Sequence, residues 1–293
     1  MAYLSVTETA KKWNMSERSV RNYCAQGRIE GAFLTGKTWN IPEDAEKPER
    51  AKRKSSKPET LLDILKREKD SKHHGGIYHK TQIDLTYNSN HIEGNRLTHD
   101  QTRYIFETNT IGIENDVVNV DDVIETANHF KCVDFIINTV NIKLTEGYIQ
   151  KLHYFLKSGT TMKWFEIGSY KKCPNEVGGI NTTLPEEVSD KMKELLSEYS
   201  SKKTITFDDI LDFHVKFERI HPFQDGNGRT GRLIMFKECL KHNIVPFIIE
   251  DNLKMYYYRG LKEWNNEKDY LTDTCLTAQD KYKAYLDYFR IKY

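Results

Sequence analysis

The sequence contains no run of about 18 apolar residues, the length that a transmembrane helix requires, so we expect no membrane span and no membrane partner. The N-terminus, MAYLS, also lacks the basic and then apolar segments of a secretory signal. The five cysteines are odd in number and form no C-x-x-C pair. This pattern argues against a disulfide framework or a zinc site and favours reduced thiols in a cytoplasmic protein.

What is present fits a soluble globular chain of 293 residues, of which 38% are hydrophobic and 30% are charged. This length is sufficient for one large domain and a small one. The net charge of +1 hides an asymmetry, because residues 1–60 contain 12 Lys/Arg and 8 Asp/Glu, a net +4, and the remainder carries −3. A basic N-terminal module is a weak indication of nucleic-acid binding.

The most informative stretch is IHPFQDGNGRTGR, residues 220–232. Apolar residues recur at helical spacing before and after it, so it is expected to form a loop between two helices. Pro222 is expected to end the first helix. Gly226 and Gly228 can take positive φ angles, which would turn backbone N–H groups inward as an anion nest.

The polar residues of the stretch suit a phosphate site. The second helix is predicted to begin near Asn227, so its N-terminus points at the same anion. Arg229 and Arg232 share a helix face and can fork onto phosphate oxygens. Asp225 beside phosphates requires a bridging cation, for which Mg²⁺ is the best candidate. A neutral His221 outside the nest could accept a proton from an attacking hydroxyl.

The stretch resembles, in full, the motif His-Pro-Phe-x-Asp-Gly-Asn-Gly-Arg-x-x-Arg of the Fic (filamentation induced by cyclic AMP) family. The resemblance implies a mainly α-helical bundle with a short β-hairpin flap. It also implies transfer of AMP from ATP to a hydroxyl of a target protein, with His221 catalytic and Mg²⁺ on Asp225. The phosphates would bind to the residues of the nest and its helix: Gly226, Asn227, Gly228, Arg229 and Arg232. Gly228 favours AMP transfer over the phosphorylating branch, which has a lysine there.

Residues 1–45 are predicted to form a small winged helix-turn-helix domain. Ser5 and Ser16 are placed to cap two helices, and residues 29–34 and 37–41 flank a turn. The pattern resembles excisionase and MerR-type regulators, which implies duplex DNA as a partner. The candidate DNA contacts lie on and just after the second helix: Arg18, Arg21, Asn22 and Arg28. A protein-binding or structural appendage is the alternative.

Residues 46–59 are charged and contain proline, so they are interpreted as a basic flexible linker. The larger, Fic-like domain then covers residues 60–293 and is persistently helical. Its later helices are predicted near 99–109, 121–141, 145–157, 185–200, 206–220, 228–242, 252–266 and 278–291.

Ser89, Glu93 and Gly94 lie in a predicted helix around 84–94, where a glutamate at the C-terminus opposes the helix dipole. They match the Fic inhibitory motif [Ser/Thr]-x-x-x-Glu-[Gly/Asn]. The resemblance implies that Glu93 pairs with Arg232 and blocks productive docking of the γ-phosphate. An unrelated exposed glutamate is the alternative.

Residues 168–179 are predicted to form a hairpin or flap whose edge could hold a target segment. The resemblance implies target docking at Glu176, Val177 and Gly178, although Tyr170-Lys171 stands where Tyr-Arg is more usual. It also implies adenine binding at Tyr258 and Asn265. Plain helix packing is the alternative for Tyr258, whereas an asparagine within a helix is unfavourable without a function.

The predicted function is therefore a protein adenylyltransferase that is inhibited by its own Glu93. Two alternatives remain open: removal of AMP, with Glu93 orienting water, or a DNA-binding regulator whose Fic domain is a sensor. The sequence does not indicate the target protein, and self-association into a homo-oligomer is left open.

Overall fold

The structure is a computed structural model that describes residues 2–48, 59–112, 117–177 and 180–293. The chain divides into two compact units, Met1–Lys57 and Pro58–Tyr293. The basic run at the centre of the predicted linker lies outside the described residues.

The N-terminal unit contains two helices and a three-stranded antiparallel sheet of order β1-β3-β2. Its elements are β1 (Tyr3–Leu4), α1 (Val6–Lys12), α2 (Glu17–Ala25), β2 (Phe33–Thr35) and β3 (Thr38–Pro42). Ser5 caps α1 in a capping box and Ser16 caps α2, as predicted. The sheet is larger than expected because β1 pairs with β3.

The predicted first strand of this unit was wrong at its start. It was expected from residue 29, but β2 begins only at Phe33, and Ile29 is instead buried in the small core with Val20 and Ile41. An isolated apolar residue after a helix does not distinguish a strand from a loop that anchors in the core.

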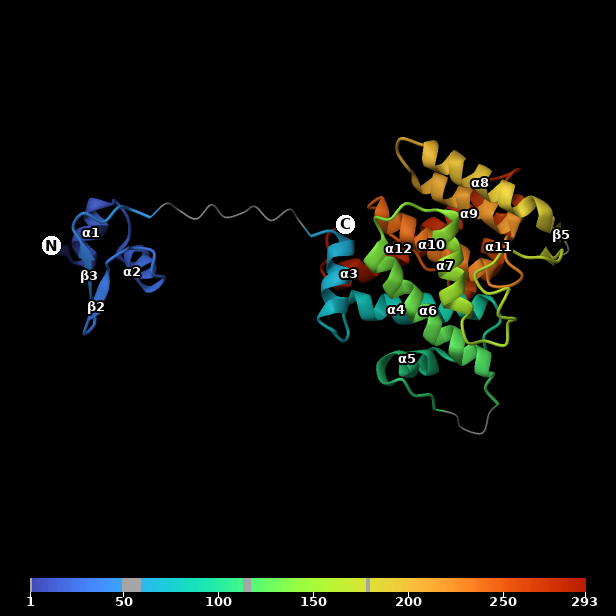
Figure 1. The fold of residues 1–293 in the computed structure, drawn as a ribbon, viewed down its shortest axis with the longest axis horizontal. Helices are drawn as coiled ribbons and strands as arrows, with labels where there is room; N and C mark the ends of the chain where they lie inside the picture. The colour runs from blue at the N-terminus through green and yellow to red at the C-terminus, as the bar shows by residue number, and fades with distance from the viewer. Residues whose placement is uncertain (1, 49–58, 113–116, 178–179) are drawn as a thin grey trace. The chain divides into compact units, whose positions relative to one another are not determined.

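The larger unit is a helical bundle with one short hairpin (Figure 1). Its helices are α3 (Leu61–Asp70), α4 (Ile77–Ile92), α5 (His99–Thr108), α6 (Val120–Thr139), α7 (Glu146–Lys157), α8 (Pro185–Ser201), α9 (Phe207–Ile220), α10 (Asn227–Lys241), the 3₁₀ helix η1 (Asp251–Leu253), α11 (Lys254–Glu263) and α12 (Asp269–Tyr288). The hairpin pairs β4 (Glu176–Val177) with β5 (Ile180–Asn181).

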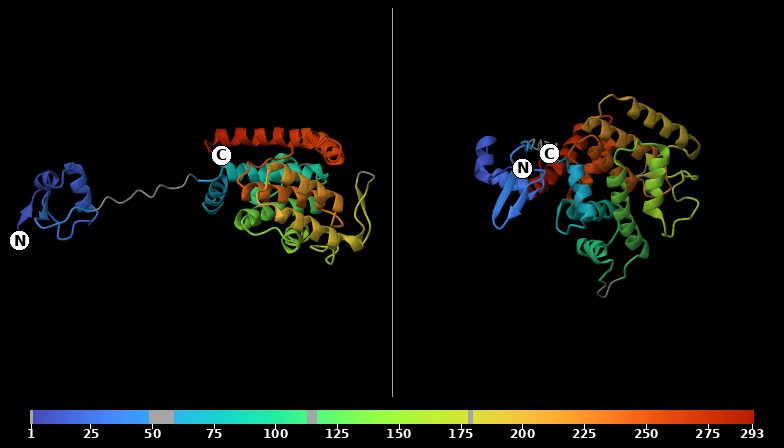
Figure 2. Two further views of the ribbon diagram at one scale, coloured as in Figure 1. Left: turned by 90° about the horizontal axis from the view of Figure 1, so that it is seen from above. Right: turned by 60° about the vertical axis from the view of Figure 1, so that its left-hand side comes forward.

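Helix α10 lies at the centre of this bundle. Thirteen of its residues are buried, and it contacts α4, α6, α7 and α9. By contrast, α5 and α8 lie at opposite edges of the unit in Figure 1, and α12 lies lengthwise along its outside in Figure 2. A helix that is buried on every side must satisfy all its polar side chains within the protein.

Most predicted helices are present within one or two residues, but the bounds of three helices were wrong. The inhibitory helix expected around 84–94 begins at Ile77. The helix expected at 252–266 ends at Glu263, after a short 3₁₀ turn. The last helix begins nine residues before the expected 278 and ends at Tyr288, and the buried face of its missed first part includes the weakly hydrophobic Thr274 and Cys275.

All five cysteines are unpaired, and four of them are buried; Cys173 is exposed. No described helix combines the length and hydropathy that a bilayer span requires.

Candidate active site

The stretch 220–232 forms the loop between α9 and α10. Helix α9 ends at Ile220, and His221 adopts a left-handed conformation with φ 50° while its N–H donates to Phe217 O at 2.9 Å. Pro222 follows at once and cannot continue the helix. The loop therefore turns sharply, with the imidazole at the turn.

Asn227 closes this loop with its side chain. Its Oδ1 accepts from Phe223 N, and its Nδ2 donates to Phe223 O, both at 2.8 Å. Phe223 is fully buried and stacks on His153 with ring centroids 3.9 Å apart. The Asn227 side chain thus fixes the loop, and only its backbone N–H remains for the phosphate contact that was expected of this residue.

The N-terminus of α10 suits an anion. Gly226 takes φ 82°, as expected, whereas the same expectation for Gly228 was wrong because Gly228 is helical. No side chain caps α10, so the first helical N–H groups, those of Asn227, Gly228 and Arg229, lack intrahelical partners. Three aligned donors at a positive helix end form a phosphate-sized site.

Gly228 has a steric role instead of a conformational one. A Cβ at this position would overlap Glu93 Oε1 and lie 3.0 Å from Arg232 NH1. The missing side chain therefore makes the space in which Glu93 and Arg232 meet.

Glu93 and Arg232 form an ion pair in which the buried Arg232 donates through NH2 to Oε1 of the partly exposed Glu93 at 2.6 Å. The same guanidinium donates to Ser89 Oγ at 3.0 Å and Ser89 O at 2.8 Å. Burial opposes the charge of Glu93, but the nearby Arg232 outweighs it and lowers the carboxyl pKa below its usual value. Gly94 follows with φ 93° and ends α4.

His221 is oriented to act as a base. Its Nδ1 lies 3.2 Å from Glu218 O, and because a carbonyl can only accept, Nδ1 carries the proton. That leaves the lone pair on Nε2. Burial lowers the pKa of His221 below its ordinary 6.5, so the neutral form dominates at neutral pH.

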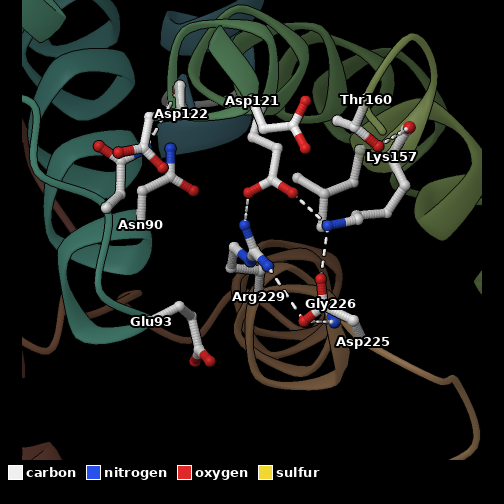
Figure 3. A network of polar contacts seen from close by, with 12 residues as sticks. Asn90, Glu93, Asp121, Asp122, Lys157, Thr160, Asp225, Gly226 and Arg229 are labelled. Carbon is white, nitrogen blue, oxygen red and sulfur yellow. Dashed lines mark hydrogen bonds and ion pairs between the residues drawn. The ribbon is translucent and has the colours of Figure 1, made fainter. Parts of the chain in front are cut away.

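Asp225 and Arg229 belong to a cluster with Lys157 on α7 (Figure 3). Glu125 on α6 also belongs to it, because it pairs with both Lys157 and Arg229. Sequence reasoning missed Glu125 and Lys157. A signal was present, because Glu125 lies one turn before His129 on the buried face of α6, where a lone carboxylate requires a buried cation. Within the described residues, no group of three or more His, Cys, Asp or Glu side chains is arranged to hold a metal ion.

Lys171 attaches the predicted flap segment to the loop between α9 and α10. Its backbone N–H donates to Pro222 O at 2.8 Å, and its buried ammonium donates to Asn175 Oδ1 and Thr182 Oγ1. Burial lowers the pKa of Lys171 to about 8. Glu176 and Val177 are exposed on β4, whereas the predicted docking residue Gly178 lies outside the described residues.

The two expected adenine residues differ in position. Plain helix packing, the alternative for Tyr258, does not fit its position: the adjacent Tyr257 is buried, whereas Tyr258 is 39% exposed and its hydroxyl lies 3.4 Å from Ile92 O. Asn265 follows the end of α11, so the argument from an asparagine within a helix fails. Its Oδ1 accepts from Arg219 NH1 at 2.7 Å.

Three of the four expected DNA contacts are exposed on α2, and the fourth, Arg28, follows that helix and is partly buried. Arg18, Arg21 and Asn22 are exposed along α2, and Arg21 lies 3.6 Å from Glu17. Arg28 stacks over Tyr23 with its guanidinium 4.7 Å from the ring centroid.

Residues 143–239 match the Fic/DOC family. The matched region begins just before α7, continues to α10 and includes the whole stretch 220–232. Solved Fic proteins share the fold. A Fic domain containing signaling protein from Bacteroides thetaiotaomicron superposes with a TM-score of 0.63 at 23% identity, over 77% of this chain and 94% of that one. Fic-1 (residues 134–508) from Caenorhabditis elegans gives 0.61 at 19% identity, over 78% of this chain and 72% of that one.

Curated relatives carry an enzyme name. "Protein adenylyltransferase fic-1" of Caenorhabditis elegans is 27% identical over 191 residues, which is 62% of this chain and 36% of that protein. "Protein adenylyltransferase Fic" of Drosophila willistoni is 31% identical over 189 residues, 60% of this chain and 35% of that protein. This chain thus spans little more than a third of the curated relatives it matches.

The steric role of Gly228 can be tested by a double-mutant cycle. Gly228→Ala should lower the free energy of unfolding by about 1–2 kcal/mol, because the added Cβ displaces Glu93. In a Glu93→Gly background this cost should fall sharply, because only the contact with Arg232 NH1 at 3.0 Å remains. Urea denaturation of the four proteins gives the coupling free energy.

Gly231→Ala is the matched control on the same helix. A Cβ there would lie 2.7 Å from Glu218 Oε1 and 2.8 Å from His214, without meeting Glu93. Its cost should persist in the Glu93→Gly background. Equal costs of Gly228→Ala in both backgrounds would contradict the assigned role.

Proposed function

We propose that the chain transfers AMP from ATP to a serine, threonine or tyrosine hydroxyl of a target protein, itself included. The observation that carries the proposal is a neutral imidazole, His221, held at one end of a loop whose other end is the uncapped N-terminus of α10. A base beside an anion site is the combination that phosphoryl-group transfer to a hydroxyl requires.

In the proposed reaction His221 Nε2 accepts the proton of the target hydroxyl. The hydroxyl oxygen forms a bond to the α-phosphorus, the bond from that phosphorus to the bridging oxygen breaks, and pyrophosphate leaves. The chain contributes mainly position and charge: the N–H groups at the start of α10 face the phosphates, and the α10 dipole stabilises their negative charge.

The residues present fit Mg²⁺. Asp225 is a single carboxylate with a 58% exposed side chain beside the phosphate site, and Mg²⁺ commonly binds one or two carboxylates together with phosphate oxygens. When bound, the ion would neutralise phosphate charge. Tyr258, exposed near the end of α4, and Asn265 are assigned to the adenine, and the edge of β4 is assigned to the target segment.

Inhibition by Glu93 forms part of the proposal. Arg232 is the guanidinium that the γ-phosphate would use, and Ser89 and Glu93 already occupy its Nε and NH2 donors. A carboxylate in that position also repels the phosphate. ATP would then bind with its α-phosphorus misaligned for the hydroxyl on the flap.

For the N-terminal unit we propose weak binding to duplex DNA. It is supported by the net +4 of residues 1–60 and by the exposed Arg18, Arg21 and Asn22 on α2. A helix with such residues on its outer face can contact base edges or phosphates.

Glu93→Gly should activate the enzyme. Its loss frees Arg232 for the nucleotide, so labelling of target or self with α-³²P-ATP should rise by at least about tenfold, the equivalent of about 1.4 kcal/mol. The double variant Glu93→Gly/Arg232→Ala should lose that gain. Labelling that is equal in wild type and Glu93→Gly would exclude the inhibitory role, and an undiminished double variant would exclude Arg232 as the restrained group.

His221→Ala in the Glu93→Gly background should lower transfer by roughly 10²–10⁴-fold while ATP still binds. The pKa of His221 in the folded protein lies below 6.5. The neutral, active imidazole therefore persists down to pH 6.5, and the transfer rate should decline only below pH 6.5. Rates measured from about pH 5 to 8 locate the transition. A transition above 6.5, or wild-type labelling by His221→Ala, would contradict the base assignment.

DNA binding should depend steeply on salt. Few phosphate contacts are available, so log K against log[salt] should have a slope of about −3 to −5. Arg21→Ala should weaken binding more than Lys11→Ala, which removes the same charge from α1. No binding of the full chain to pooled duplex fragments at low salt would favour the protein-binding alternative.

A further inference from the structure

Four charged side chains form a cluster at the N-terminus of α10, which we call the charge frame. They are Glu125, Lys157, Asp225 and Arg229. Three of them, Glu125, Lys157 and Arg229, are 8%, 5% and 6% exposed. Asp225 alone faces outward, at 58%. The proposed reaction uses Asp225 and Arg229, but it gives no role to Glu125 or Lys157.

Glu125 and Lys157 connect the other two members of the frame; Figure 3 labels Lys157, Asp225 and Arg229. Glu125 binds Lys157 Nζ with one oxygen and Arg229 NH1 with the other. Lys157 Nζ also donates to Asp225 Oδ2 at 2.5 Å, and Arg229 NH2 lies 3.5 Å from Asp225 Oδ1. Each cation of the frame therefore bridges the same two carboxylates.

The frame lies directly against the phosphate site. A Cβ on Gly226, the residue before α10, would be 3.4 Å from Lys157 Cδ. Among the described residues, the buried Nε of Arg229 has no hydrogen-bond acceptor. A charge added to or removed from the frame would therefore be felt by a phosphate with little intervening water.

Charge balance determines what the site can bind. With two cations and two carboxylates, the frame is formally neutral, so Asp225 does not by itself repel a phosphate. Removing Lys157 would leave one net negative charge, which disfavours a bare nucleotide and favours a divalent cation. Removing the charge of Glu125 would leave one net positive charge, with the opposite result.

We propose that Glu125 and Lys157 are positioning residues that hold Asp225 and Arg229 and set the balance between metal-free nucleotide and divalent metal at this site. Lys157 is a built-in cation for Asp225, and Glu125 remains its counter-ion when a metal takes the Asp225 carboxylate. The identity of the nucleotide as ATP rests on the proposed function.

The test measures ATP binding by calorimetry, once in EDTA and once in saturating Mg²⁺. The parent protein is the full chain carrying His221→Ala, which prevents turnover, and each further substitution is added to it. Lys157→Met should weaken ATP binding in EDTA by about tenfold. Saturating Mg²⁺ should restore most of the lost affinity. Glu125→Gln should strengthen binding in EDTA and gain less from Mg²⁺. Lys157→Arg, which keeps the charge, should behave like the parent protein.

Lys151→Met is the matched control, because it removes the same charge from an exposed position on α7 and should leave both affinities unchanged. A purely structural role would weaken binding equally with and without Mg²⁺ in both frame variants, and that result would overturn the inference. If thermal denaturation shows that Lys157→Met does not fold, the Glu125→Gln variant tests the inference alone. Stronger ATP binding by this variant in EDTA supports the inference, and weaker binding overturns it.

The two proposals can fail separately. If the parent protein binds ATP but the Glu93→Gly protein transfers no AMP, the proposed function is contradicted. The opposite changes in ATP affinity expected of Lys157→Met and Glu125→Gln would still test the role of the frame. A parent protein that binds no ATP would overturn both.

Discussion

The site depends on the burial of two guanidinium groups on a helix that has no solvent-facing side. Arg229 and Arg232 are each about 5% exposed within α10, and an unpaired buried charge is too costly to persist. Each therefore requires a carboxylate from another helix. Glu125 on α6 serves Arg229, and Glu93 at the end of α4 serves Arg232.

This requirement gives the two arginines different properties in the ligand-free protein. Arg229 is held by a carboxylate that is itself buried and shared with Lys157. Arg232 is held by Glu93, whose side chain is 27% exposed and lies at a helix end. Breaking the second pair demands less rearrangement, because the departing carboxylate can reach water. Regulation is accordingly easier to place on Glu93 than on Glu125.

The sequence predicted the helical framework well because its signals are local. The capping residues Ser5 and Ser16 mark two helix starts, and each of them caps a helix in the structure. The loop 221–226 was recognised from contiguous residues, and the left-handed Gly226 was expected from its lack of a side chain. Helix α12 began earlier than predicted because small buried residues carry little periodic signal.

The contacts among the other members of the site could not be predicted, because only packing brings these residues together. Glu125 and Lys157 are 32 residues apart, on separate helices, and neither has a local pattern that names its partner. The role of Gly228 likewise depends on Glu93, which is distant in the sequence. Tyr257 and Tyr258 are adjacent tyrosines, and only the orientation of α11 decides which one is buried.

The pattern of cysteine burial has a practical consequence. Cys173 is the single exposed thiol, and it lies in the segment that leads into β4, two residues after the buried Lys171. The other four thiols are enclosed, so a maleimide dye should attach selectively at Cys173 in the native protein. The wild-type chain thus carries its own attachment point for a fluorophore or spin label beside the flap, and movement there could be followed without engineering a cysteine.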